Sequence, residues 1–166
     1  MTDHIHGSRK AWQAGLALIA CLCVDSMHPA GAEEVDDTAL ALVEQRKLGE
    51  GLAWLGYQGA SRTVTFASIV QAVGRTQAQE LVQRELQRLQ PDYQTQWDRN
   101  LAAAYARSFT AEELRLLNEG NDSPSLASRF RVRNTQVSAD MKARSSELLG
   151  QFVSRALGNA QAALQR

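Results

Sequence analysis

Residues 93–124 read YQTQWDRNLAAAYARSFTAEELRLLNEGNDSP, and this stretch decides the fold. Its first half repeats a large apolar side chain every fourth residue, at Tyr93, Trp97, Leu101 and Tyr105. This spacing places the four side chains on one drifting face of a helix, which we predict begins at Pro91. We expect this aromatic stripe to form the centre of the core, packed against Leu114, Leu117 and the Phe130 region.

The second half of the stretch carries signals for helix ends. Thr110 to Glu113 form a capping box, in which the threonine hydroxyl accepts from the N–H three residues on and Glu113 reaches back. Gly120 is suited to the left-handed end of that helix. Ser123 and Pro124 then predict a new helix, because proline costs nothing in the first helical turn.

The C-terminal part from Pro124 to about Leu164 contains no further proline. Apolar residues recur along it at Leu126, Phe130, Val137, Met141, Leu148, Phe152 and Leu157. One straight helix of this length would reach about 60 Å, whereas a compact domain of this size is about 35 to 40 Å across. We therefore expect a break or a bend near Asn134-Thr135 or Ser138.

The residues before the stretch also predict helices. A first helix is expected from about Asp36 to Lys47, followed by a glycine-punctuated segment, 49–61, that we interpret as a loop or a broken helix. A second helical region should cover about Phe66 to Leu89, with a kink at Gly74 and its end at Pro91. Strand signals are scarce, so the predicted fold is all-α, a compact bundle of about five to six helices.

The first 32 residues have the order of a secretory signal peptide. Arg9 and Lys10 are its positive region, and AGLALIACLCV over 14–24 is an apolar core too short to span a membrane. Ala30-Gly31-Ala32 is the small-x-small pattern that signal peptidase accepts. We expect cleavage after Ala32, which leaves residues 33–166 as a single helical domain in the periplasm or outside the cell, with no transmembrane span.

Two other interpretations of the N-terminus stay open. Leu18-Ile19-Ala20-Cys21 resembles a lipobox, which would anchor a lipoprotein through Cys21. Against this, the apolar run continues past Cys21 and the Ala-Gly-Ala site would then have no role. The segment could also be a buried N-terminal helix of a cytoplasmic protein, although its polar region around Pro29 argues against this.

The expected mature chain lacks histidine and cysteine altogether, because His4, His6, His28, Cys21 and Cys23 all precede residue 33. It therefore has no disulfide, no Ser-His-Asp or Cys-His arrangement and no soft metal site. We expect no catalytic residues, no metal and no cofactor. The chain has 18 basic and 18 acidic residues, so its net charge favours neither nucleic acid nor an anionic membrane.

The remaining polar candidates each have a simpler structural explanation. Ser61 could in principle work with Lys47 or Lys142, but a solvated loop serine is the favoured interpretation. Glu50, close in sequence to Trp54 and Tyr57, is the best glycan-cleaving carboxylate of a poor set, and Glu113 already caps a helix. The basic residues Arg129, Arg131, Arg133 and Arg144 do not share one helix face, so we expect a solvated surface, with contact to anionic lipid as the alternative.

The stretch from Asn100 to Asn134 resembles DUF2059, a family of exported bacterial helical proteins whose activity is not established. The motif residues that match are Tyr105, Phe109, Thr110, Glu113, Leu114, Leu117, Ser123 and Pro124. The chain departs from the family at the polar Glu119-Gly120-Asn121, at Leu126 and at Asn134. The resemblance, that of a divergent member, implies export and a helical fold but transfers no site residues.

Three functions follow as hypotheses. The first is a non-enzymatic protein that binds an envelope protein. The second is a carrier of lipid or another small apolar ligand, with a pocket lined by Trp54, Tyr57, Tyr93, Trp97 and Tyr105. The third, and the weakest, is a histidine-free hydrolase of cell-wall glycan.

Overall fold

The computed structural model describes residues 30–120 and 123–165, and these form helices and turns with no strand among them. The helices are α1 (Ala30–Gln45), α2 (Leu52–Ala60), α3 (Val64–Val73), α4 (Arg75–Ser108), α5 (Ala111–Glu119) and α6 (Pro124–Ala163). The prediction of an all-α bundle of five to six helices is confirmed. The expected signal peptide lies outside the described residues except for Ala30 to Ala32, which form the start of α1.

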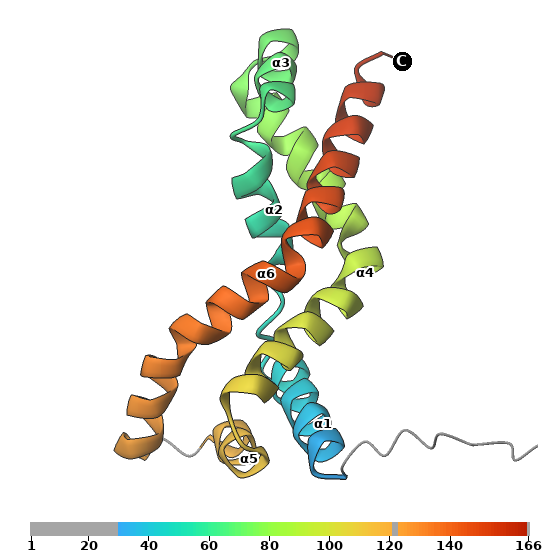
Figure 1. Cartoon of the computed structure of the whole chain (residues 1–166). Coiled ribbons are helices and arrows are strands. Elements are labelled where there is room, and N and C mark those ends of the chain that lie inside the picture. Colours follow the sequence, from blue (N-terminus) through green and yellow to red (C-terminus); the bar gives the residue numbers. More distant parts are fainter. Residues whose placement is uncertain (1–29, 121–122, 166) are drawn as a thin grey trace, which may run out of the picture.

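Two long helices, α4 and α6, run antiparallel and cross along most of the molecule (Figure 1). The shorter helices pack around α4: α1 contacts it near one end, while α2 and α3 contact it near the other. α5 packs on α1. Every other helix therefore depends on α4 directly or through one neighbour.

The predicted helix end at Pro91 is wrong, because α4 passes through this residue without interruption. Proline removes one backbone donor and crowds the carbonyl four residues earlier, which bends a helix but does not have to end it. α4 changes direction near its middle in Figure 1, consistent with such a bend. Helices on several sides of α4 hold the two halves together.

The segment interpreted as a loop or broken helix contains the regular helix α2. A Cβ atom on Gly56 would lie 2.7 Å from a ring carbon of Phe152 and 2.9 Å from a methyl of Leu86. There is therefore no room for a side chain at residue 56, because α2 lies directly against α4 and α6. The sequence pattern does not distinguish such a packing glycine from a loop glycine.

Gly74 separates two helices where a kink was predicted. Its φ of 82° is a conformation that favours glycine, and α3 ends before it while α4 begins after it. At the start of α3, the Thr63 side chain accepts a hydrogen bond from the Phe66 N–H at 3.1 Å.

The predictions around α5 are confirmed. Thr110 Oγ1 accepts from the Glu113 N–H at 3.2 Å, and the Glu113 carboxylate accepts from the Thr110 N–H at 3.1 Å. Gly120 is left-handed, with φ 77°, and Pro124 stands in the first turn of α6. Arg46, directly after α1, adds a cap, since it donates to the Asn118 carbonyl at 2.8 Å.

α6 has no break, since Pro124–Ala163 is one continuous helix, but the helix changes direction along its length in Figure 1, so of the two predicted alternatives it is the bend that is found. Size arguments assume a compact domain, but the start of α6 extends away from α4 in Figure 1. The helix gains its support from α4, α2 and α3 along the rest of its length.

The aromatic stripe is part of the core but not its centre. Trp97 and Tyr105 are buried, whereas Tyr93 and Leu101 are half-buried at its edge. The deepest packing surrounds Phe152 of α6, which is completely buried and lies 5.1 Å from the Tyr93 ring. Tyr105 stacks 6.2 Å from Phe130 as predicted.

Candidate functional site

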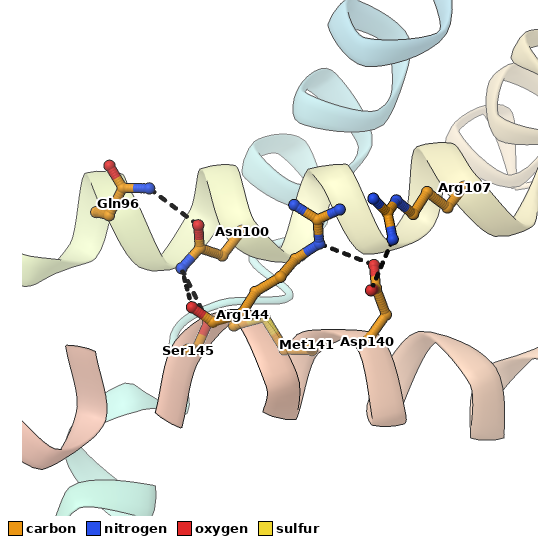
Figure 2. A network of polar contacts seen from close by, with 7 residues as sticks. All are labelled: Gln96, Asn100, Arg107, Asp140, Met141, Arg144 and Ser145. Atoms are coloured by element: carbon orange, nitrogen blue, oxygen red, sulfur yellow. Dashed lines mark hydrogen bonds and ion pairs between the residues drawn. The ribbon is translucent and has the colours of Figure 1, made fainter. Parts of the chain in front are cut away.

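A buried polar contact fixes the register between α4 and α6. Asn100 donates to Ser145 Oγ at 3.0 Å and accepts from Gln96 at 2.9 Å, as Figure 2 shows. The Ser145 hydroxyl in turn donates to the Met141 sulfur at 3.3 Å. Ser145 is almost fully buried, so these partners offset the cost of removing its hydroxyl from water.

A second polar contact lies about one turn further along the same pair of helices. Asp140 on α6 accepts from Arg144 at 2.8 Å and from Arg107 of α4 at 3.2 Å (Figure 2). The hydrogen bond from Arg144 is the main reason that the pKa of Asp140 lies below its ordinary value, and Arg107 adds to the effect. Both arginines therefore form ion pairs with the Asp140 carboxylate.

Beside these polar contacts between α4 and α6, the helices α2, α4 and α6 form a groove of about 670 Å³. Its volume is within the range of about 300 to 1,000 Å³ that small-molecule sites occupy. The groove is lined by Leu55, Gly59, Trp97, Leu101, Tyr105, Asn134, Val137, Ser138, Met141, Lys142, Ser145, Ser146, Leu149, Gly150 and Val153.

The α6 wall of the groove consists of two parallel rows of side chains. The inner row is buried or half-buried and mostly apolar: Val137, Met141, Ser145, Leu149 and Val153. The outer row is exposed, and its members follow one another at four-residue spacing: Ser138, Lys142, Ser146 and Gly150. Since residues four apart share a helix face, the outer row forms a continuous polar rim above an apolar floor.

The lining of the groove carries one positive charge and no carboxylate. That charge belongs to Lys142, which makes no ion pair or hydrogen bond within residues 30–120 and 123–165. The other ionisable lining group is the Tyr105 phenol, whose pKa is raised by burial, so that it stays neutral. The electrostatic character of the groove is therefore set by one ammonium group at its rim.

Of the five aromatic residues predicted to line one pocket, only two line the groove. Trp97 and Tyr105 line the groove, but Tyr57 packs edge-on against Phe66 at 6.0 Å and Tyr93 packs against Phe152. Trp54 is 64% exposed. The prediction is thus wrong for three of the five residues. On α2, Trp54 points outward and Tyr57 packs on Phe66, while Tyr93 of α4 faces Phe152 of α6.

Comparisons with family models, with curated proteins and with solved structures find no match for this chain.

The candidate catalytic residues are engaged elsewhere. Glu50 is exposed and pairs with Lys47 at 3.1 Å, away from the groove. The hydroxyl of Ser61 donates to the Gln58 carbonyl at 3.2 Å, and Ser61 does not line the groove. Groups of histidine, cysteine, aspartate or glutamate that could hold a metal ion are not found among the described residues.

The basic cluster divides among different partners. Arg129 and Arg133 converge on Glu113, with distances of 3.1 and 2.8 Å to its two carboxylate oxygens. Burial alone would raise the pKa of Glu113, but its bond from the Thr110 N–H and the two arginines together lower it. Arg144 pairs with Asp140, while Arg131 stays exposed, so the structure contains no single basic patch from these residues.

Of the residues that line the groove, only Trp97 and Tyr105 were predicted as part of a ligand pocket. Lys142 was considered only as a partner of Ser61, and Ser146 was not considered, although their spacing with Ser138 and Gly150 marks one polar row beside an apolar one. The contribution of Leu55 and Gly59 could not be found from this pattern, since it depends on how α2 packs. None of the described helices is long and apolar enough to cross a membrane.

Proposed function

We propose that this chain is an exported, non-enzymatic helical protein that works by holding a small apolar ligand in the groove between α2, α4 and α6. The observation that carries the proposal is the groove itself, whose floor is apolar and whose volume suits such a ligand. The groove favours the hypothesis of a ligand carrier over that of a protein that binds an envelope protein. A flat surface would have favoured the protein partner.

The lining contains no histidine and no carboxylate that could act as a general base. Lys142 and Ser146 are the residue types of a serine–lysine pair, but a lysine that acts as a base is a buried one, whereas Lys142 is exposed. A general base has to stand within hydrogen-bond reach of the proton it removes. In the groove the nearest candidates are the serines and Lys142, without a carboxylate beside them. The arrangement therefore supports binding without reaction.

Export is part of the proposal and is supported by the sequence of residues 1–32. Gly31 and Ala32 are exposed at the start of α1, whereas its buried side chains begin at Ala39. Of the described residues, cleavage after Ala32 would thus remove none that is buried in the core. We also propose, from the motif residues between Tyr105 and Pro124, that the chain is a divergent relative of the DUF2059 proteins.

The mass of the protein recovered from its host tests the export proposal. The expected mass corresponds to residues 33–166 without lipid. A diacylated mass that starts at Cys21 would place the protein on a membrane instead, and an intact N-terminus in the cytoplasm would contradict export.

Two glycines of α6 provide a matched test of the groove. Gly150 lines it, whereas Gly158 lies outside it, and a Cβ on either residue meets no atom within 4 Å. Gly150→Leu should place a side chain across the rim and reduce binding of the neutral apolar dye N-phenylnaphthylamine at least about tenfold, a difference of roughly 1.4 kcal/mol. Gly158→Leu should leave binding unchanged.

Both variants should preserve or raise the unfolding temperature, because leucine is a better helix former than glycine by up to about 1 kcal/mol. Equal dye binding by the two variants, or the absence of any dye binding to the unmodified protein, would refute the groove as a binding site.

A protein partner remains a second candidate because of Trp54. Its indole is 64% exposed on α2, next to Leu55 of the groove, and tryptophan is enriched in the energetic centres of interfaces. Trp54→Ala should abolish co-purification of a periplasmic protein if this candidate is right, and should not alter dye binding in the groove.

A further inference from the structure

We propose that the ligand of the groove is a single-chain fatty acid, with its carboxylate at Lys142 and Ser146 and its chain in the apolar part of the groove that α2 helps to form. The inference rests on the proposed function and specifies the ligand class of the same site. It is carried by charge complementarity, by the pairing of two donors and by the length of the groove.

Charge complementarity comes from the unpaired ammonium group. A lysine beside an apolar floor, with no carboxylate in the lining, favours a ligand that has one negative charge. The other basic residue nearby, Arg144, is bound to Asp140 at 2.8 Å and is not free to take this role. A cationic amphiphile would find no counter-charge in the lining.

Lys142 and Ser146 form a two-donor site on the outer row of α6. Residues four apart have Cβ atoms about 5 to 6 Å apart on the same helix face. The ammonium and hydroxyl groups can therefore both reach the two oxygens of one carboxylate. The third polar side chain of this row, Ser138, already donates to the Asn134 carbonyl at 2.8 Å.

The length of the groove fits one acyl chain. Between Lys142 and Val153 the α6 wall rises about 16 Å, at about 1.5 Å per residue. A single acyl chain occupies half of a hydrocarbon core of about 30 Å, thus about 15 Å. Over this distance the wall is completed by Leu149 and, from the other helices, by Trp97 and Leu55.

The antiparallel register places Trp97 within this part of the groove. On α4 it lies between Tyr93, which contacts Phe152, and Asn100, which bonds Ser145. Leu149 lies between the same two contacts on α6. An acyl chain that runs from Lys142 toward Val153 thus passes the indole, which provides a spectroscopic signal.

Calorimetric titration of the full protein as purified from its host tests the inference with three probes of equal chain length: dodecanoate, dodecanol and dodecyltrimethylammonium. Dodecanoate should bind about tenfold more tightly than dodecanol, because a charge-assisted hydrogen bond contributes about 1.5 kcal/mol or more. Dodecyltrimethylammonium should bind least.

The decisive variants are Lys142→Gln and its control Arg131→Gln. Both remove one positive charge from α6, but Arg131 is exposed outside the groove. Lys142→Gln should lower the affinity for dodecanoate about tenfold and leave that for dodecanol unchanged, whereas Arg131→Gln should alter neither. Ser146→Ala should cause a smaller loss, for dodecanoate alone.

Bromine atoms on a fatty acid chain should quench the fluorescence of Trp97, and Trp97→Phe should remove most of this quenching. Equal affinities for dodecanoate and dodecanol, or equal losses in the Lys142 and Arg131 variants, would overturn the carboxylate site while the groove remained a binding site. Tighter binding of dodecyl phosphate than of dodecanoate would also overturn it. If none of the probes binds, the proposed function itself fails.

Discussion

Glu113 illustrates how one side chain can have two structural roles. It completes the capping box of α5 and accepts from Arg133 of α6, whose guanidinium also lies 5.4 Å from the centre of the Phe109 ring. Few other contacts hold α5 to α6, since α5 packs mainly on α1. The carboxylate is thus the main polar link between α5 and the start of α6.

The Glu113→Gln variant should lower the free energy of unfolding by about 1 to 3 kcal/mol at pH 7. Glutamine keeps the cap, because it can also accept from the Thr110 N–H, so the loss reflects the two arginines. Glu112→Gln is the control, since Glu112 is exposed and pairs only with Arg115, and it should change stability by less than about 1 kcal/mol. Urea unfolding of the three proteins measures the difference.

The pH dependence of that difference follows from the lowered pKa of Glu113. A carboxyl group whose pKa falls on folding contributes stability that is fully present above its ordinary value of 4.5. This contribution is lost as pH falls through the lower folded-state pKa. The gap between the original protein and Glu113→Gln should therefore shrink from pH 7 to pH 3, and a constant gap would show that the charge of Glu113 does not stabilise the fold.

At the scale of helices, the sequence predicted ends well where a side chain caps the backbone locally. Thr110 with Glu113, Gly120 and Pro124 all act on the turn in which they stand, so their effect does not depend on the rest of the fold. Gly56 and Pro91 were misinterpreted because their effect depends on tertiary packing. A glycine under Phe152 and a proline inside a supported helix have no local signature that separates them from loop residues.

The same distinction explains the outcome for the groove. The two rows of α6 are visible in its four-residue spacing, so Lys142 and Ser146 could have been singled out. Leu55 and Gly59 reach the groove only because Gly56 lets α2 approach α6. No pattern within the segment 49–61 contains that information.

Replacement of Pro91 by alanine should stabilise α4. The change restores a backbone N–H that can donate to the Gln87 carbonyl, and proline is about 3 kcal/mol less favourable than alanine inside a helix. Because α4 has adapted to the bend, we expect a gain of about 1 to 2 kcal/mol in thermal unfolding. Thr95→Ala, one turn further along the exposed side of α4, should change stability by less than about 0.7 kcal/mol.

A loss of stability in Pro91→Ala would indicate that the bend is needed to keep α4 in contact with both α1 and α2. The crossing of α4 and α6 would then depend on proline at this position. Circular dichroism would separate this case from a local loss of helix, since the helical content should stay constant.

At the scale of the whole molecule, core and groove share one wall. Trp97 is 7% exposed and belongs to the hydrophobic core, yet its indole also lines the groove. Tyr105 likewise belongs to the core and lines the groove, and its ring stacks on Phe130. A site of this kind is preorganised, because the side chains that would meet a ligand are already held by the packing of α4 against α6.

Replacement of Trp97 therefore has to affect folding and binding together. Trp97→Ala should lower the free energy of unfolding by about 3 to 5 kcal/mol, since an aromatic side chain leaves a large cavity when it is truncated in a core. The same variant should enlarge the groove and weaken dye binding. Trp97→Phe keeps most of the apolar surface, so it should lose less stability and retain binding.

Thermal unfolding and dye titration of both variants distinguish the two contributions. If Trp97→Ala unfolds at the original temperature while binding disappears, the indole serves recognition and the fold does not need it. α4 and α6 would then be held together by their other contacts, such as Tyr93–Phe152, Asn100–Ser145 and Tyr105–Phe130. If stability falls but binding per folded molecule is unchanged, the indole belongs to the core only, and the ligand must lie on the Lys142 side of the groove without reaching α4.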